Sequence, residues 1–296
     1  MIAIAAWPVR APTPPLERPP NLLAKRITGR NYLSHSQISL MRTCARKFSF
    51  LYTEKAPPDF IPNSLIFGGS IHSALELWYR CKLEGLGVTY EALLSAYHDG
   101  WRRQLEKARE QAGGDVPVRF NKGQDVNTLH AMAGRMLTAF LASPLASPKG
   151  EIVGIEEQLR VVLDPELPDV LAKLDLVTET NGSLHVIDFK TSRSRWNEEK
   201  AREGADQLVL YAATVEKLSR SLGLPVKLHF AVLTKHKTPQ VQLLPVAVDP
   251  GRIGVLREGV AQVWQAIQSG NFYPSPSPMN CSTCPFKSKC PVFAVS

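Results

Sequence analysis

A single tight turn constrains the fold of this chain more than any other feature. The dipeptide Asn181-Gly182 separates two apolar runs, VLAKLDLVTET before it and SLHVIDFKTS after it. Asn-Gly favours a two-residue hairpin turn because both residues tolerate positive φ. We therefore expect two antiparallel strands in which Thr180 pairs with Ser183. Counting outward from this pair places Asp175 directly opposite Asp188.

The facing carboxylates and a nearby lysine indicate a chemical use for this hairpin. Like charges directly opposite each other destabilise a sheet, and a divalent cation such as Mg²⁺ or Mn²⁺ would remove that cost. Lys190 lies two residues after Asp188, so the two side chains share a face. Together with Asp175 they fit phosphodiester hydrolysis, in which a metal polarises the phosphate and activates water. The alternative is a hairpin with a solvated Asp/Lys pair on its wet face.

The rest of the chain predicts a mixed α/β fold behind a proline-rich N-terminus. Residues 1–31 are expected to form a flexible arm. The folded part then comprises a helical part over 32–148, an α/β core over 150–270 and a loop-like tail over 271–296. The expected helices span 70–84, 89–112, 124–142, 204–221 and 251–269, and strands are expected near 226–234 and 240–248.

Composition narrows the class of protein. The 296 residues are 44% hydrophobic and 21% charged, as in soluble globular proteins. Lys and Arg outnumber Asp and Glu by 35 to 27, which favours a polyanionic partner without proving one. The sequence contains no apolar run of about 18 residues, so we expect no membrane span. Five cysteines, an odd number, do not indicate a secreted disulfide framework, and we expect an intracellular, cytoplasmic protein.

The cysteines form a spaced set. The segment CSTCPFKSKC contains Cys281, Cys284 and Cys290 in a C-x₂-C-x₅-C pattern, and Cys44 lies far upstream in RTCARKF. The first two cysteines alone are compatible with a zinc half-site or with a redox pair. Cys81 has no partner at a useful spacing and is expected to be a small buried hydrophobe.

Taken together, these motifs resemble the PD-(D/E)XK nuclease superfamily. Asp175 followed by Asp188-Phe189-Lys190 matches the spaced acid and the D/E-x-K motif of that superfamily. FGGSIHSALE is similar to the G-x-x-x-H-x-x-L-E helix of its RecB-like branch, which includes the nuclease modules of RecB and AddB and the CRISPR-associated exonucleases. DQLVLYA is similar to the Q-L-x-x-Y helix of the same branch. One departure is Ala172, where the family often has glycine.

The resemblance implies a restriction-endonuclease-like fold, with a mixed β-sheet flanked by helices, and a set of site residues. It implies that His72, Asp175 and Asp188 bind Mg²⁺ or Mn²⁺, and that Asp175, Asp188, Lys190, Gln207 and Tyr211 are catalytic. Glu76 and Glu156 are candidates for supporting roles beside these residues. The alternatives are a core histidine at His72, a helix ion pair at Glu76 and an ordinary amphipathic helix around Gln207 and Tyr211.

In the RecB-like branch, the cysteine pattern resembles the iron–sulfur site of AddB. The resemblance implies that Cys44, Cys281, Cys284 and Cys290 hold a [4Fe-4S] cluster, and Zn²⁺ in a Cys₄ site is the alternative. The tail is rich in proline and poor in core-forming residues, so we expect only such a strong cross-link to fix it to the front helices.

These expectations combine into one function and its rivals. We expect a metal-dependent DNA exonuclease that acts on single strands or free ends in repair, recombination or end processing, with a helicase or recombination complex as a candidate partner. The rival is a non-catalytic DNA-binding or assembly subunit of such a complex. A small-molecule redox protein is a third reading, but the sequence has no Gly-rich cofactor loop to support it. The candidate DNA-binding residues, which could instead form solvated surfaces, are Arg42, Arg46, Lys47, Arg193, Arg195 and Trp196.

Overall fold

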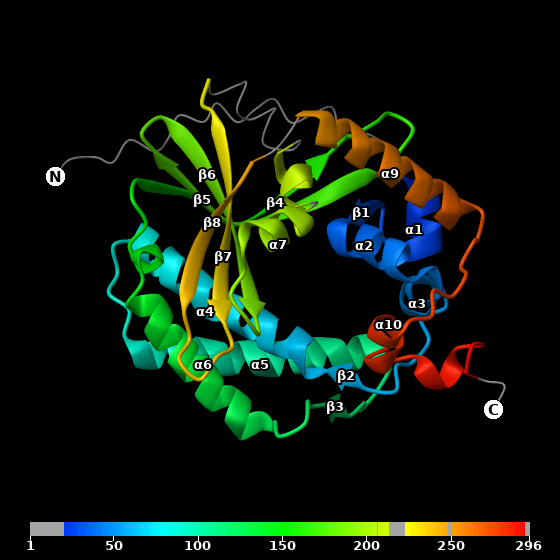
Figure 1. Cartoon of the computed structure of the whole chain (residues 1–296), viewed down its shortest axis with the longest axis horizontal. Coiled ribbons are helices and arrows are strands. Elements are labelled where there is room, and N and C mark those ends of the chain that lie inside the picture. The colour runs from blue at the N-terminus through cyan, green and yellow to red at the C-terminus, as the bar shows by residue number, and fades with distance from the viewer. Residues whose placement is uncertain (1–20, 206, 213–222, 248–249, 294–296) are drawn as a thin grey trace.

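A mixed six-stranded sheet forms the centre of the molecule, with helices on both faces (Figure 1). The computed structural model describes residues 21–205, 207–212, 223–247 and 250–293. The strands of the sheet are β1 (Tyr32–Ser34), β4 (Glu151–Val161), β5 (Asp169–Thr180), β6 (Ser183–Ser192), β7 (Val226–Thr234) and β8 (Val241–Val246). Two short strands, β2 (Ile61–Pro62) and β3 (Val118–Arg119), pair in parallel away from this sheet.

The pairing around β5 determines where the sheet opens. Strand β4 runs antiparallel to β5 along most of its length, while β1 and β6 pair with opposite ends of β5. Because β4 holds one side of β5 at both ends, β1 and β6 share its other side. The β1 pairing ends at Leu171 and the β6 pairing begins at Leu176, so the stretch of β5 between them, which carries Asp175, is paired with neither. Beyond β6 the sheet continues through β7, which is parallel, to β8, which is antiparallel.

The helices lie on the two faces of the sheet and beyond its end. They are α1 (Leu22–Thr28), α2 (His35–Thr43), α3 (Ala45–Phe48), α4 (Asn63–Leu83), α5 (Tyr90–Ala112), α6 (Val126–Leu141), α7 (Glu198–Glu203), α9 (Pro250–Gln268) and α10 (Pro278–Ser282). A π-helical turn (Ser49–Thr53) follows α3, and short 3₁₀ turns occur at Pro144–Ala146 and Lys287–Lys289. None of the helices in the described ranges is long and apolar enough to span a bilayer.

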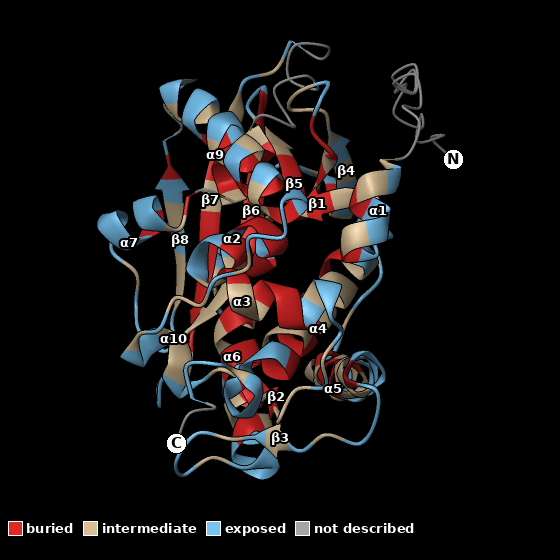
Figure 2. Cartoon of the chain, turned by 90° about the vertical axis from the view of Figure 1, so that its right-hand side faces the viewer, coloured by how far each residue is buried: buried red, intermediate tan, exposed pale blue. Residues whose placement is uncertain are grey.

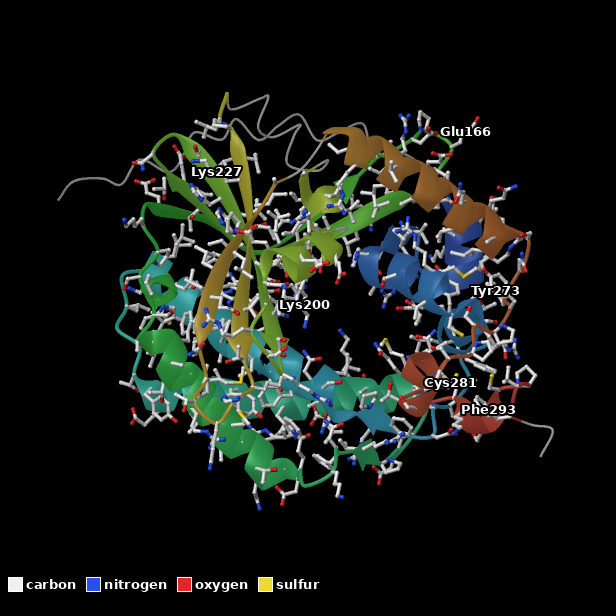
Figure 3. The ribbon with its side chains drawn as sticks, in the orientation of Figure 1. Glu166, Lys200, Lys227, Tyr273, Cys281 and Phe293 are labelled. Carbon is white, nitrogen blue, oxygen red and sulfur yellow. The ribbon has the colours of Figure 1, made fainter. Side chains whose placement is uncertain are left out.

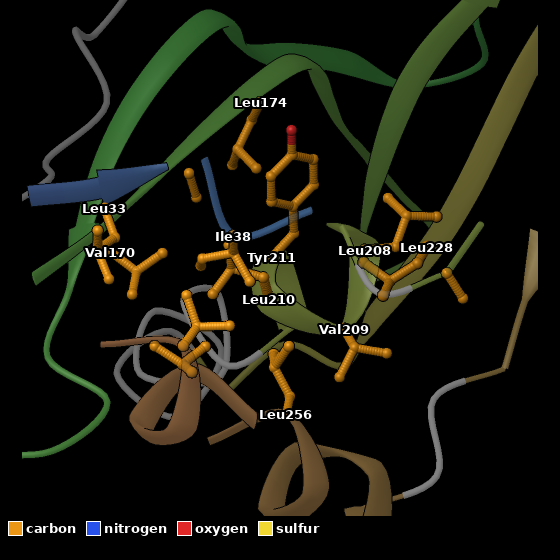
Figure 4. Close-up of a cluster of buried hydrophobic side chains, with 14 of the residues drawn as sticks. Leu33, Ile38, Val170, Leu174, Leu208, Val209, Leu210, Tyr211, Leu228 and Leu256 are labelled. Atoms are coloured by element: carbon orange, nitrogen blue, oxygen red, sulfur yellow. The ribbon is translucent and has the colours of Figure 1, made fainter. Parts of the chain in front are cut away.

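The sheet separates two hydrophobic cores. Val186 and Phe230 belong to the first core, which α2 and α9 cover, and Ile187 and Phe189 belong to the second, which α4, α5 and α6 cover. Neighbouring residues of β6 thus enter opposite cores, as strand alternation requires. Figure 2 shows the strands buried between helices whose outer faces are exposed, and Figure 4 shows part of the first core.

The mixed α/β fold expected from the sequence is confirmed, with differences at the N-terminus. Residues 22–28, expected within the flexible arm, form α1, because Asn21 caps the helix through its side chain and Ala24 is fully buried. Helix α4 also begins at Asn63, before the residue expected from periodicity. Residues 1–20 lie outside the described residues. So does most of the helix predicted over 204–221, of which 207–212 are helical.

Candidate active site

The hairpin has the register that its turn predicts. Asn181 and Gly182 have φ of 52° and 64°, as a type I′ turn requires. Pairing runs from Thr180 with Ser183 to Leu176 with Ile187, and the next pair in this register is Asp175 with Asp188. The ladder ends there, because Asp175 Oδ2 accepts the backbone N–H of Phe189 at 2.7 Å. The two aspartates therefore face each other where the strands begin to part, and both are buried.

A ring of polar contacts ties Asp188 to a helix of the first core. The Lys190 ammonium lies 2.6 Å from Asp188 Oδ2 and donates to Gln207 Oε1 at 2.7 Å. Gln207 Nε2 donates to the Tyr211 hydroxyl at 2.5 Å, and this hydroxyl donates to Asp188 Oδ1 at 3.4 Å. Figure 4 shows the Tyr211 hydroxyl directed away from the apolar side chains of Val209 and Leu256. Gln207 and Tyr211 thus hold Lys190 and Asp188 in place.

The two facing carboxylates have different proton affinities. Burial raises the pKa of Asp188 to about 6, although the Lys190 charge opposes the shift and the Asp175 charge adds to it. Against the effect of burial, the charge and hydrogen bond of His72 lower the pKa of Asp175. Burial and the two aspartates raise the pKa of Tyr211, so its hydroxyl stays a neutral donor. Two close carboxylates that share a site characteristically diverge in this way.

A second set of ligand atoms surrounds Asp175. His72 Nδ1, from α4, lies 3.5 Å from Asp175 Oδ1 and 3.8 Å from Glu156 Oε1. The other ring nitrogen, Nε2, lies 3.0 Å from the Phe189 carbonyl oxygen, and since a carbonyl only accepts, Nε2 carries the hydrogen. Although burial opposes it, the negative charge of Asp175 and the neighbouring carboxylates raise the pKa of His72 to about 10. Because Nε2 is hydrogen-bonded to the Phe189 carbonyl, Nδ1 is the nitrogen that faces the carboxylates.

This donor set fits a divalent metal ion. Ligand atoms of His72, Glu156 and Asp175 all lie within 4.8 Å of one another. Carboxylate oxygens with one imidazole are ligands for Mg²⁺ or Mn²⁺, and a hydrogen bond from the far ring nitrogen commonly orients such a histidine. Without a metal, a proton on His72 supplies the positive charge between two carboxylates. A cation bound there would replace that proton.

Glu156 has a larger place in the site than the sequence indicated. It lies across from Asp175, because Ile155 pairs with Leu176 and Glu157 pairs with Leu174. Its φ of 55° is in the left-handed region, which costs a non-glycine residue roughly 1–3 kcal/mol and is found at functional sites.

Lys173, which sequence reasoning missed, forms an ion pair with Glu156 Oε2. The i, i+2 spacing of Lys173 and Asp175 was a usable signal for this contact, but only with the β4–β5 register in hand. No tight turn in the sequence fixes that register.

Two other residues singled out by the family resemblance have structural surroundings. Glu76 lies one turn after His72 but forms an ion pair with Arg80 at 2.8 Å on the helix surface. Ala172 is fully buried in the first core and pairs with Leu159, so the methyl group that replaces the usual glycine is accommodated.

The six basic or aromatic residues proposed for DNA binding occupy different places. Arg46 and Lys47 line the pocket of the cysteines, and Arg42 lies against Gly259 of α9. Beyond the end of β6, Arg193 and Arg195 are exposed. The sixth residue, Trp196, packs against the first core and donates its indole N–H to Ser192 Oγ at 3.0 Å.

Four cysteines converge on one pocket at the C-terminal end of the chain. Cys44, Cys281, Cys284 and Cys290 all line it, and each is a free thiol. Burial and the neighbouring thiols of Cys44 and Cys290 raise the pKa of Cys284. Cys81, half-buried on α4, is not among the residues that line this pocket. In Figure 3, Cys281 and Phe293 mark the two segments of the tail that border it.

The tail is also held by contacts that involve no thiol. Asp59 accepts hydrogen bonds from the Ser288 hydroxyl, the Ser288 amide at 3.1 Å and the Lys289 ammonium at 3.1 Å. The Phe286 ring stacks on Phe50 with centroids 5.4 Å apart. Polar and aromatic contacts therefore dock this tail on the front of the molecule, in addition to the cross-link expected from the sequence.

Comparison with known proteins assigns the family. The model of the PD-(D/E)XK nuclease superfamily matches residues 32–291, and the chain belongs to that superfamily. Membership implies metal-dependent nuclease activity. Comparison with curated proteins gives no match.

Two solved structures are similar to the chain. One, described as a "putative exonuclease" from Eubacterium rectale, has 12% identity and a TM-score of 0.46, over 93% of this chain and 89% of the other. The protein SSO0001 has 11% identity and a TM-score of 0.31, over 79% of this chain and 86% of the other.

Proposed function

We propose that this protein is a Mg²⁺- or Mn²⁺-dependent deoxyribonuclease that digests DNA from free ends, with single strands as the preferred substrate. The observation that carries the proposal is the facing pair Asp175 and Asp188 with the Lys190 ammonium 2.6 Å from Asp188. Carboxylates for a metal and a cation for a phosphate are thereby joined in one buried site.

The residues of the site have different proposed roles in hydrolysis. His72, Glu156 and Asp175 would hold the metal, with Asp188 as a further ligand, and the bound ion would polarise the scissile phosphate and acidify a water molecule. Lys190 stabilises the negative charge that develops on the phosphate during attack. Gln207 and Tyr211 act as positioning residues, because they bond to Lys190 and Asp188.

We further propose that Cys44, Cys281, Cys284 and Cys290 bind a [4Fe-4S] cluster. The cations Arg46, Lys47 and Lys287 line the same pocket and would balance the negative charge of a thiolate-bound cluster. Zn²⁺ in a Cys₄ site is the alternative, and metal analysis of the purified protein decides between the two.

We propose that the protein processes DNA ends in the cytoplasm during repair or recombination, where a helicase or recombination complex would supply single strands. The net charge of +8 supports contact with a polyanion.

The direct test uses purified protein with end-labelled linear and closed-circular DNA, single- and double-stranded, with Mg²⁺ or Mn²⁺ and with chelator. We expect digestion of linear single strands that stops on chelation. Cleavage of closed circles would show an endonuclease instead. DNA binding with no cleavage under any metal condition would support the rival, a non-catalytic DNA-binding or assembly subunit.

A further inference from the structure

A pocket beside the turn of the β5–β6 hairpin has the composition of an anion site. It is a cavity of about 570 Å³ between that hairpin, the starts of β7 and β8, and the segment that follows α6. Its charged lining residues, Lys149 and Lys227, are both positive, and no carboxylate lines it. Ser147, Thr178 and Asn181 add hydroxyl and amide groups. The pocket therefore combines hydrogen-bond donors with positive charge.

This pocket is separate from the aspartates. His185 and Ile187 line it, and on β6 they share a face with Phe189, which enters the second core. Asp188 and Lys190 lie on the opposite face of the same strand. Figure 3 shows Lys227 at the far side of the molecule from the cysteine pocket, which Cys281 marks. A ligand held here would touch neither proposed metal site.

Two histidines at the pocket share a proton. The rings of His185 and His229 are nearly parallel, with 11° between their planes, and His185 Nδ1 lies 3.0 Å from His229 Nε2. One of these nitrogens must donate to the other. Burial, together with the charges of His185 and Lys227, lowers the pKa of His229 to about 4, and burial lowers that of His185. The pair is therefore neutral at pH 7, with one N–H and one lone pair at its outer ends.

The burial of one outer nitrogen favours one arrangement of those protons. His229 Nδ1 is shut off from solvent and has no hydrogen-bond partner among the described residues. A buried N–H without a partner is rarer than an unused acceptor, so the favoured tautomer has no hydrogen on His229 Nδ1. His229 then donates from Nε2 to His185 Nδ1, and His185 carries its own hydrogen on Nε2. The pair thus presents a donor from His185.

Apolar side chains complete the pocket. Leu145, Ile187, Val241 and Leu243 line it alongside the imidazoles. Its volume lies in the range of about 300–1,000 Å³ that is usual for small-molecule sites, which combine apolar walls with a few fixed polar groups. An apolar wall beside a cationic rim matches a ligand that carries both a flat ring and a phosphate.

We propose that this pocket binds the phosphate of a nucleotide through Lys149, Lys227 and His185, with the base against the apolar wall. The phosphate could belong to a free mononucleotide or to a nucleotide of a DNA strand. The site is distinct from the catalytic centre, and the proposal does not depend on nuclease activity.

The test measures binding of deoxythymidine monophosphate, inorganic phosphate and a short oligothymidylate to the full chain by calorimetry. Lys149→Ala/Lys227→Ala should weaken binding at least tenfold, because two exposed cations are removed without disturbing a core. Lys25→Ala/Lys122→Ala is the matched control, since both lysines are exposed and lie outside the pocket, and it should bind as wild type. Asp188→Asn protein should also bind as wild type, which separates this site from the nuclease centre.

Each outcome decides a question. Tighter binding of the mononucleotide identifies a free nucleotide as the ligand, and tighter binding of the oligothymidylate identifies a DNA strand. Either result supports the phosphate site if Lys149→Ala/Lys227→Ala weakens that binding. Titration should also shift the His185 ring ¹⁵N signals and leave those of His98 unchanged. Equal losses in the pocket and control variants, loss of binding in Asp188→Asn, or no binding at millimolar ligand would overturn the proposal.

Discussion

The aspartate hairpin and the cysteine tail are both proposed metal sites, but the chain builds them in opposite ways. Asp175 and Asp188 are close in sequence, and a two-residue turn fixes their register. Cys44 reaches Cys281 and its neighbours across almost the whole chain, and scattered contacts such as that of Asp59 with Ser288 align them. The carboxylate pair of the first site is assembled locally, whereas the cysteine site requires nearly every element between its parts to be folded.

This difference separates chemistry from stability. The hairpin closes a short loop, which costs little entropy. Burial and the charge of Asp175 raise the pKa of Asp188, so its ionised carboxylate lowers the stability of the fold at neutral pH. The tail closes a very long loop, and its contacts must offset that entropy cost. We therefore expect changes in the hairpin to remove activity without loosening the protein, and changes in the tail to lower stability first.

The largest effect should come from Asp188→Asn. Loss of this carboxylate removes a proposed metal ligand and the partner of Lys190, and we expect DNA hydrolysis to fall about 10²- to 10³-fold, on the scale of other preorganised charges. The midpoint of thermal unfolding should stay the same or rise, because the repulsion from Asp175 is removed. Rates on labelled DNA and circular dichroism melts measure the two quantities. Glu76→Gln, on the same helix face as His72, should change neither the rate of hydrolysis nor the unfolding midpoint. An equal loss of hydrolysis in Glu76→Gln would contradict the assignment of Asp188 to the active site.

A ligand from outside the hairpin sharpens the comparison. Glu156→Gln should weaken the apparent affinity for Mn²⁺ roughly 10- to 100-fold, the scale found when groups around a metal are altered. Titration calorimetry with the metal alone measures this without relying on activity. Glu157→Gln, at the exposed neighbouring position, is the control. If both variants bind Mn²⁺ like wild type, the hairpin alone makes the site.

The tail should respond in the reverse order. Cys284→Ser should eliminate the absorption near 400 nm, which gives a brown colour, together with the bound iron. It should also lower the unfolding midpoint by several degrees, because a bound cluster stabilises only the folded state. Cys81→Ser should keep colour and stability. Metal analysis decides between about four irons with sulfide and one zinc. The tail site would be contradicted if wild-type protein purified anaerobically is colourless and metal-free and Cys284→Ser does not lower the unfolding midpoint.

The same contrast explains what could be predicted from the sequence. The mixed α/β fold, the hairpin register and the ion pair of Asp188 with Lys190 all follow from alternation and one turn, which are local rules. The helices expected over 89–112 and 124–142 from periodicity correspond to α5 and α6, whose N-termini are capped by Thr89 and Asp125. Alternation and the Asn-Gly turn agree with the structure, whereas α1 and the first residues of α4 were not predicted.

The remainder depended on long-range packing. No sequence rule reveals that Glu156 adopts a left-handed φ, because that follows from the β4–β5 register across an irregular loop. The docking of Ser288 on Asp59 joins segments with no shared pattern. Arg46 and Lys47, which are predicted to bind DNA, also line the cysteine pocket, which the sequence did not indicate. In each case the missing information was which distant element lies alongside.

The smallest effect tests whether the tail depends on its thiols alone. Asp59→Ala removes the hydrogen bonds from Ser288 and Lys289 and should cost about 1–2 kcal/mol, which is a drop of a few degrees in the unfolding midpoint. Against the effect of burial, those hydrogen bonds lower the pKa of Asp59. A lowered carboxyl pKa stabilises the fold above the unfolded value of about 3.9, and this contribution is lost as pH falls further through the folded value.

The difference between wild type and Asp59→Ala should therefore be constant from about pH 5 to 8 and shrink below about pH 4, as the linkage relation requires. Asp115→Ala is the control, because its partner Arg109 forms a largely exposed pair at 2.8 Å and such pairs contribute little. The decisive background is Cys284→Ser. If Asp59→Ala still lowers the midpoint there, the protein contacts hold the tail independently of any metal. If its effect vanishes in that background, docking requires the thiols, and the two regions differ more sharply than the contacts of Asp59 indicate.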